Sequence, residues 1–200
     1  MAPQILRAGD RESAPWKNGG GLTAQVAVHP PGAGTDDFGW RVSVADVAAG
    51  GPFSAFPGVE RIITLVEGAG MELVVDGVAH TVHEPYEPFV FSGDADTECR
   101  LLGGPIVDFN VMVRRAVAAA RVRVVRSRTA VRAAPGMEVL VVVLEGAAVL
   151  ERAGVRLGRL DAVRLSEGEG DDLGVEGVLA VVELEERDGA WPGVGRADRR

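Results

Sequence analysis

The chain has 200 residues, of which 46% are hydrophobic and 25% charged, and its formal net charge at pH 7 is -8. A chain of this length buries roughly 70% of its unfolded surface, so its core needs no disulfide or metal, and the single cysteine, Cys99, excludes an intrachain disulfide. The negative charge argues against a nucleic-acid partner. Without an apolar leader or an apolar run of about 20 residues, we expect a cytoplasmic protein with no membrane partner.

The first polar segment is PWKNGGG, residues 15–21. It contains the only lysine of the chain, Lys17, which lies between Trp16 and Asn18 and is followed by three glycines. No Gly-Lys-Ser/Thr sequence closes the glycines, so they do not form a phosphate loop. They predict a turn or a close approach to another strand, and contact of their N–H groups with a ligand is the alternative.

Short apolar runs, many of them alternating and separated by Gly, Pro and Asp, predict β-strands over most of the chain. In FGWRVSVADV, alternation places Arg41 and Ser43 on one face. In DFNVMVRR, Asp108 and Asn110 share a face opposite three apolar side chains. If the apolar faces pack against other strands, we expect these polar side chains to line an interior.

The first strand predicted between these two segments is RIITLVEG, whose first residue is Arg61. Further on, Asp76-Gly77 predicts a hairpin turn, because glycine readily takes the positive φ that such turns need. His80 and His83 follow; being three apart on a strand, they point to opposite faces and make no converging His-x-His pair. We therefore expect exposed histidines at strand edges, no metal and no cofactor. A bent backbone at HTVHEP, bringing the two histidines together, is the alternative.

The chain also repeats itself. Glu67-Gly68-Ala69 recurs 78 residues later as Glu145-Gly146-Ala147, and Gly93-Asp94 recurs 77 residues later. Two similar β units are predicted. Arg61 corresponds to Val139 in the second unit, so we expect any polar site to lie in the first.

Each unit is predicted to contain, in order, a strand, a Glu-Gly turn, a strand, an Asp-Gly turn and a Gly-Asp turn. This order, which occurs twice, resembles the β-barrel of the cupin class. The resemblance implies an all-β bicupin, with two double-stranded β-helix barrels in tandem. We expect residues 1–115 to form the barrel with the pocket and residues 136–190 a barrel without it, which N-terminal strands could complete. Residues 116–135 are expected as a connection and residues 191–200 as a tail.

The connection region is rich in arginine and contains no acid between residues 114 and 132. Such a segment is typical of a solvated connection or of a face that pairs with acids elsewhere. The arginines are Arg114, Arg115, Arg121, Arg123, Arg126, Arg128 and Arg132.

Four ordered motifs carry a more specific resemblance: APWKNGGGLTAQ, FGWRVSVADVAAGGPFSAFPGVERIITLVEGAGMELVVDG, FSGD and LLGGPIVDFNVMVRR. They resemble the HutD/Ves family, bacterial bicupins associated with histidine utilisation. The likeness is dense over residues 3–115 and extends to the second barrel by pattern. It implies a metal-poor protein that limits or senses a pathway intermediate, with urocanate and the formylated or formiminated glutamates as candidate ligands. Gln25 stands where many relatives have an acid, and Glu60 where Asp is usual.

A small carboxylate of this kind needs cations and amide groups in a largely apolar pocket. Arginines can grip it through paired hydrogen bonds, a lysine offers a point charge, and asparagines can both donate and accept. The candidate ligand-binding residues are Trp16, Lys17, Asn18, Arg41, Ser43, Phe53, Arg61, Asp108 and Asn110, with Phe56 as a further apolar wall.

These assignments have simpler alternatives. Trp16 and Phe53 could be core residues, and Arg61 could pair with Glu60 or Glu67 at the surface.

The leading hypothesis is a HutD-like bicupin that binds an intermediate of histidine degradation, with a regulatory consequence. A metal-independent isomerase or hydrolase is the alternative, because burial of Lys17 or Asp108 would shift a pKa toward catalytic use. No catalytic residue is identified. A third hypothesis is an interaction protein that acts through the arginine-rich segment, and a homodimer through the second barrel remains open.

Overall fold

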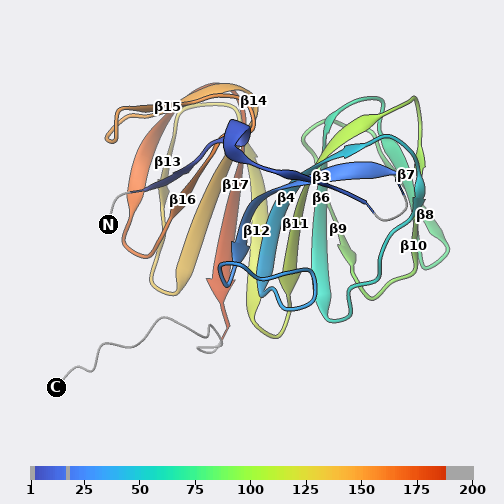
Figure 1. The fold of residues 1–200 in the computed structure, drawn as a ribbon. Helices are drawn as coiled ribbons and strands as arrows, with labels where there is room; N and C mark the ends of the chain where they lie inside the picture. The colour runs from blue at the N-terminus through green and yellow to red at the C-terminus, as the bar shows by residue number, and fades with distance from the viewer. Residues whose placement is uncertain (1–2, 17–18, 188–200) are drawn as a thin grey trace.

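The computed structural model describes residues 3–16 and 19–187. These residues form strands and one 3-10 turn, η1 (Ala8–Asp10), arranged as two lobes that lie side by side (Figure 1). The predicted all-β class is confirmed. In this part of the chain no helix is long and apolar enough to cross a membrane.

The first lobe consists of a six-stranded and a four-stranded antiparallel sheet. The six strands run in the order β2 (Ser13–Pro15), β3 (Gly21–His29), β4 (Trp40–Val47), β11 (Ile106–Arg114), β6 (Val59–Glu67) and β9 (Pro88–Ser92). The four strands run in the order β5 (Gly51–Pro52), β10 (Thr97–Leu101), β7 (Met71–Val75) and β8 (Val78–Val82). Asp76 and Gly77 join β7 to β8 with φ of 48° and 81°, which confirms the predicted hairpin turn.

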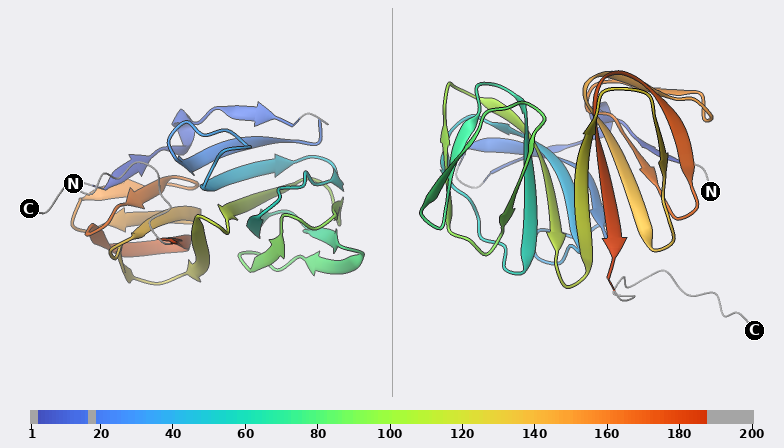
Figure 2. Two further views of the ribbon diagram at one scale, coloured as in Figure 1. Left: turned by 90° about the horizontal axis from the view of Figure 1, so that it is seen from below. Right: turned by 180° about the vertical axis from the view of Figure 1, so that it is seen from behind.

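The second lobe is one seven-stranded sheet that curves around its own apolar interior (Figure 2). Its main path is β1 (Gln4–Leu6), β16 (Ala162–Leu165), β14 (Met137–Leu150), β17 (Gly170–Glu186) and β12 (Ala118–Val125). In addition, β13 (Thr129–Arg132) pairs with β17, and β15 (Val155–Leu157) pairs with β14. The first strand of the chain thus completes the edge of the second lobe, whereas β2 belongs to the first.

An apolar layer joins the two lobes. On the first lobe it consists of side chains from β4, β6 and β11, including Trp40, Ile62 and Phe109, and on the second of side chains from β14 and β17, including Leu140 and Val182. Because side chains alternate along a strand, the neighbouring residues of β4, β6 and β11 point away from the second lobe, into the first.

The repeated Glu-Gly dipeptide marks the same irregularity in both lobes. Gly68 and Gly146 have left-handed φ of 101° and 73°, and the strand register shifts beside each of them. A Cβ on Gly68 would lie 2.7 Å from the carbonyl oxygen of Pro105, and one on Gly146 would clash with the backbone of Glu176. Glycine is needed at both positions because the bulge brings two strands into close approach.

Residues 116–135, expected as a connection, instead contribute β12 and β13. Their small and β-branched residues supply an apolar face, with Ala118 fully buried and Val122 packed against the layer between the lobes. The arginines point the other way: Arg123 contacts Glu183 at 3.3 Å. The alternative, a face that pairs with acids elsewhere, describes this segment better than a solvated connection.

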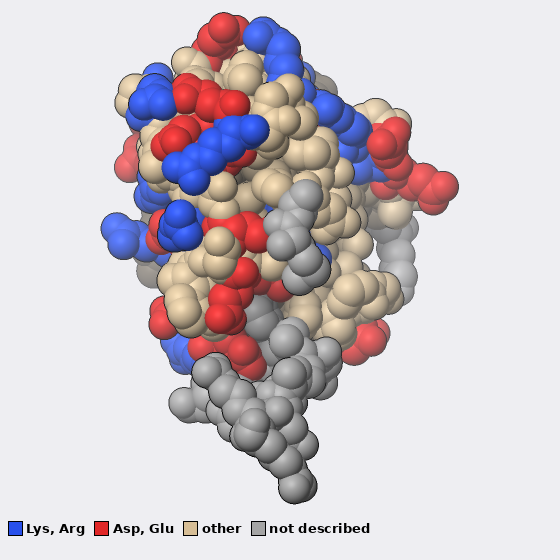
Figure 3. Space-filling view, turned by 90° about the vertical axis from the view of Figure 1, so that its left-hand side faces the viewer, with Lys and Arg blue, Asp and Glu red and all other residues tan. Residues whose placement is uncertain are grey.

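Charged side chains of both signs are interspersed on the face of the second lobe seen in Figure 3. In the second lobe three arginines pair with acids, with N–O distances of 2.9 Å for Arg128 and Glu151, 3.1 Å for Arg152 and Asp172, and 3.0 Å for Arg156 and Glu176. These three arginines are therefore balanced by neighbouring acids.

Candidate functional site

Polar side chains gather on the inward face of the six-stranded sheet of the first lobe. The register places Arg41 of β4 opposite Met112 of β11, Met112 opposite Arg61 of β6, and Arg61 opposite Phe91 of β9. Residues directly opposite each other on neighbouring strands share a face and lie about 5 Å apart. These side chains therefore form one row across four strands.

The next two rows contain the remaining polar candidates. Ser43 lies opposite Asn110, and Ala45 lies opposite Asp108. The sheet thus brings Arg41, Ser43, Arg61, Asp108 and Asn110 to a single interior face.

Arg61 is the most unusual of these residues, because its side chain is only 7% exposed and its guanidinium carbon lies among aromatic rings. The distances to the ring centres are 4.8 Å for Phe53, 5.0 Å for Phe91 and 5.7 Å for Phe56. Burial lowers the pKa of Arg61 to about 10. The rings stabilise the cation through its faces, which leaves its N–H donors available, and Nε has no hydrogen-bond partner among the described residues.

This environment excludes the surface ion pair considered for Arg61. Glu67 instead contacts Arg159 of the second lobe at 2.6 Å. Arg61 keeps its charge inside the lobe, where arginine is rare unless it is paired.

Two unpartnered acceptors lie on the same face. Asp108 and Asn110 are 2% and 9% exposed, and the Oδ1 atom of each has no hydrogen-bond partner in the described part of the chain. Burial, with a smaller contribution from Asp46, raises the pKa of Asp108 to about 7, although the Arg61 guanidinium acts in the opposite direction. An unpartnered buried polar atom costs about 1–3 kcal/mol, so a ligand that satisfied these atoms would recover that cost.

Arg41 is held more loosely. It is half-buried, burial lowers the pKa of its guanidinium, and its Nε donates to Oε1 of Gln25 at 3.1 Å. Ser43 is buried between Gln25 and Asn110 in the register. Gln25, the departure from the family pattern noted above, therefore acts as the acceptor for Arg41.

The glycine-rich segment passes close to β4. A Cβ on Gly21 would lie 2.6 Å from the carbonyl oxygen of Asp46 and 3.3 Å from the ring of Trp16. Trp16 is half-buried, donates from Nε1 to Thr23 at 2.7 Å, and packs against the apolar interior of the first lobe. Close approach to another strand is thus the correct interpretation of Gly21. Lys17 and Asn18 lie outside the described residues.

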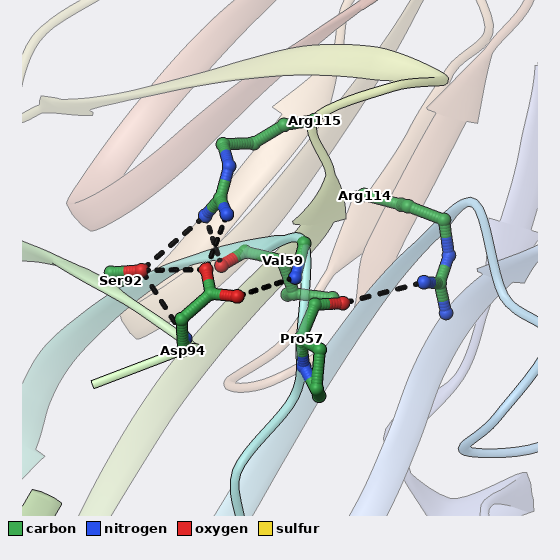
Figure 4. A network of polar contacts seen from close by, with 7 residues as sticks. Pro57, Val59, Ser92, Asp94, Arg114 and Arg115 are labelled. Atoms are coloured by element: carbon green, nitrogen blue, oxygen red, sulfur yellow. Dashed lines mark hydrogen bonds and ion pairs between the residues drawn. The ribbon is translucent and has the colours of Figure 1, made fainter. Parts of the chain in front are cut away.

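The rings of Phe53 and Phe56 lie against Arg61. The chain that follows them, from Pro57 to Val59, is held by a network of polar contacts (Figure 4). Asp94 accepts from the backbone N–H of Gly58 at 2.9 Å and pairs with the guanidinium of Arg115, which also donates to the carbonyl of Val59 at 2.7 Å. These contacts lower the pKa of Asp94. They give the FSGD motif and the final arginine of VMVRR a shared structural role, the support of the loop.

Replacing Asp94 by alanine is expected to loosen this loop, because the change removes the acceptor of the Gly58 N–H and the partner of Arg115. Hydrogen exchange at the amides of Gly58 and Phe56 should become several-fold faster, as in other regions that lose local stability. Asp96→Ala, in the same turn and also exposed, is the matched control. Equal exchange rates in the two variants would show that Asp94 does not hold the loop.

The histidines occupy three different places. His80 lies on the edge strand β8, half-buried, with its ring 5.0 Å from that of Phe89, and His83 is exposed, with Nε2 3.3 Å from Oε1 of Glu84. His29 ends β3 and stacks on Trp40, with the ring centres 5.9 Å apart. No group of three or more His, Cys, Asp or Glu in residues 3–16 and 19–187 is placed to hold a metal ion.

The aromatic side chain of Phe91 was missed as a site residue. Its signal is the alternation of EPFVFSGD, in which Phe89 and Phe91 share a face. Only the pairing of β9 with β6 shows that this face meets Arg61.

A shallow hollow of about 200 Å³ opens at the rim of the first lobe, lined by residues that include Asp46, Glu67, Gly68 and Ile106. It lies beside the ends of β4, β6 and β11 and does not include Arg61, Asp108 or Asn110. The interior polar groups are thus covered by side chains in this structure.

Several solved structures share the fold. A bacterial pirin from Escherichia coli in complex with nickel(II) matches with a TM-score of 0.64 at 12% identity, over 92% of this chain and 98% of that one. A quercetin 2,3-dioxygenase from Acinetobacter baumannii matches with a TM-score of 0.62, also at 12% identity, over 94% of this chain and 80% of that one. At such low identity these matches show a cupin-like β fold and nothing of the chemistry.

Closer relatives share the sequence as well. A 21.2 kDa protein from the hutC 3′ region of Pseudomonas putida is 39% identical over 90% of this chain and 96% of its own. Protein Ves of Citrobacter koseri is 44% identical over 54% of this chain and 56% of its own. The structure of HutD from Pseudomonas fluorescens is 37% identical, covers 93% of this chain and 100% of that one, and has a TM-score of 0.80. The HutD family model matches residues 8–182, and the chain therefore belongs to the HutD family.

Proposed function

We propose that this protein is a cytoplasmic bicupin whose first barrel binds a small carboxylate intermediate of histidine degradation, and that binding regulates histidine utilisation. The candidate ligands are urocanate and the formyl and formimino derivatives of glutamate. One observation carries the proposal: Arg61 is a buried cation, ringed by three phenylalanines and without an ion-pair partner in the described part of the chain. A site of this kind is suited to an anion that brings the missing acceptors.

The contrast between the two lobes supports a single site. Val139, which corresponds to Arg61, is buried in a cluster of Val, Leu and Ala side chains inside the second lobe. An apolar interior of this kind provides packing but no hydrogen bonds to a carboxylate. In a two-barrel molecule the second barrel would then serve as a scaffold.

Entry of a ligand requires the loop of Phe53 and Phe56 to move, because these rings cover the guanidinium. The link to histidine utilisation rests on the relatives, one named HutD and one encoded in the hutC 3′ region.

The test is a panel of histidine, urocanate, formiminoglutamate and formylglutamate, followed by thermal unfolding and calorimetry. A ligand at 100 times its Kd stabilises a protein by about 2.7 kcal/mol, which a melting curve resolves readily. We expect one of the carboxylates to stabilise the protein and to remain unchanged in NMR spectra recorded over hours. If no compound of the panel raises the melting temperature, the proposed site is wrong.

A second candidate function is favoured by Asp108, whose raised pKa of about 7 suits a general acid or base. Conversion of a panel compound, lost in Asp108→Asn, would establish a metal-independent isomerase or hydrolase in place of a binding protein. The same NMR series separates the two functions.

A further inference from the structure

Asp108 and Arg61 face the same interior without forming an ion pair. Asp108 lies two rows from Arg61 on the adjacent strand, with Asn110 in the row between them, and each of the two charged groups acts on the pKa of the other. Neither group forms an ion pair with the other within residues 3–16 and 19–187, and Oδ1 of Asp108 and Nε of Arg61 both lack hydrogen-bond partners there. An anion that is held by Arg61 and extends along this face past Asn110 would reach the carboxyl of Asp108.

The charged groups around Asp108 do not balance a second anion beside it. From β6 the only cation acting on it is Arg61, and from β4 the acting group is Asp46, itself an acid. The thiol of Cys99, from the opposite sheet, stays neutral because burial and Asp108 raise its pKa to about 11. Arg41 lies beyond Met112, with its Nε bound to Gln25. A carboxylate beside an ionised Asp108 would thus place two negative charges next to one positive charge in a dry interior, and two carboxylates in such a site share a proton instead.

We propose that the carboxylate ligand is taken up together with a proton, which Asp108 holds and donates as a hydrogen bond to the ligand. This inference rests on the proposed function and adds the protonation state of the site and the role of Asp108, which is to position the ligand. The bound cluster then contains Arg61 as cation, the ligand as anion and Asp108 as a neutral acid. No bond other than O–H is formed or broken, and the proton comes from solvent.

The pH dependence follows from the pKa of about 7 in the free protein. At pH 6 Asp108 is already largely protonated, so ligand binding takes up only a small fraction of a proton. At pH 8 ligand binding takes up about nine-tenths of a proton. The apparent Kd should rise about fivefold from pH 7 to pH 8 and about tenfold from pH 8 to pH 9.

The experiment is calorimetry with N-formylglutamate, whose own carboxyl groups ionise well below pH 6. At pH 8, heats measured in buffers of different ionisation enthalpy give the number of protons bound, and we expect about 0.9. Asp108→Asn, a permanently neutral isostere, should bind with the same Kd at pH 6 and pH 8 and take up no proton. Asp96→Asn, at an exposed position of the first lobe that does not act on the pKa of Asp108, should keep the parent behaviour.

The outcomes separate this inference from the function on which it rests. Binding with no proton uptake at pH 8 in the parent protein overturns the inference and leaves the carboxylate site intact. The buffer series needs no variant, so it decides the question even if Asp108→Asn does not fold. If no compound of the panel binds at any pH, the proposed function fails, and the inference fails with it.

Discussion

Arg61→Met is expected to abolish carboxylate binding and at the same time to stabilise the unliganded protein by about 1–3 kcal/mol. The lowered pKa of Arg61, about 10 against 12.5, corresponds to roughly 3 kcal/mol of destabilised cation, from which the lost contacts with the aromatic rings must be subtracted. Methionine fills a similar volume among the rings without charge. Asp108 is not stranded as an anion, since burial already favours its neutral form.

Chemical denaturation and calorimetry with the ligand panel measure the two effects on the same variant. The matched control is Arg100→Met, because Arg100 is exposed on β10 and contacts Glu72 at 3.0 Å. That variant should keep its affinity and change stability by no more than about 0.5 kcal/mol. Unchanged affinity in Arg61→Met would remove Arg61 from the site, and a loss of several kcal/mol would mean that the guanidinium is structural.

Asp108→Asn is expected to flatten the dependence of stability on pH. The pKa of Asp108 is raised from 3.8 to about 7 by folding, so between these values the native state binds more protons than the unfolded state. The contribution of Asp108 to the stability of the parent protein is therefore largest below the lower value and falls as pH rises toward 7, by an amount on the order of 3 kcal/mol between pH 5 and pH 8. The asparagine variant lacks this contribution, so its advantage over the parent should grow across the same window.

Urea unfolding at pH 5, 6, 7 and 8 measures the difference between the two proteins. Asp96→Asn serves again as the control. Parallel stability curves for the parent and Asp108→Asn would show that Asp108 is ionised throughout, and the proton-linked binding proposed above would lose its physical basis.

The sequence alone was sufficient to predict features that depend on local order. Alternation in FGWRVSVADV and DFNVMVRR correctly placed Arg41 with Ser43 and Asp108 with Asn110, because a strand repeats every two residues whatever it packs against. The hairpin at Asp76 is equally local, since it reflects a backbone conformation that glycine tolerates best. The turn expected at Glu145-Gly146 was wrong, because these residues lie inside β14 at a bulge.

Features that depend on distant partners were harder to predict. The aromatic surroundings of Arg61 come from residues 53, 56 and 91, and only the pairing of β6 with β9 and the path of one loop bring them together. For β12, the arginines suggested solvent, whereas the interspersed Ala and Val determined the outcome by packing against the layer between the lobes. Burial on one face is decided by what lies opposite, which no local pattern contains.

The position of β1 has a consequence for biosynthesis. Gln4 pairs with Arg164, so β1 leaves the ribosome long before its partner strand β16 is made. During that interval β1 has no partner strand. The edge of β16 that pairs with β1 is likewise unpaired once β16 has been synthesised. Pairing of β1 with β16, which closes the second lobe, is therefore a late folding step that must bring together two distant parts of the chain. Until it occurs, β1 of one nascent chain can pair with β16 of another.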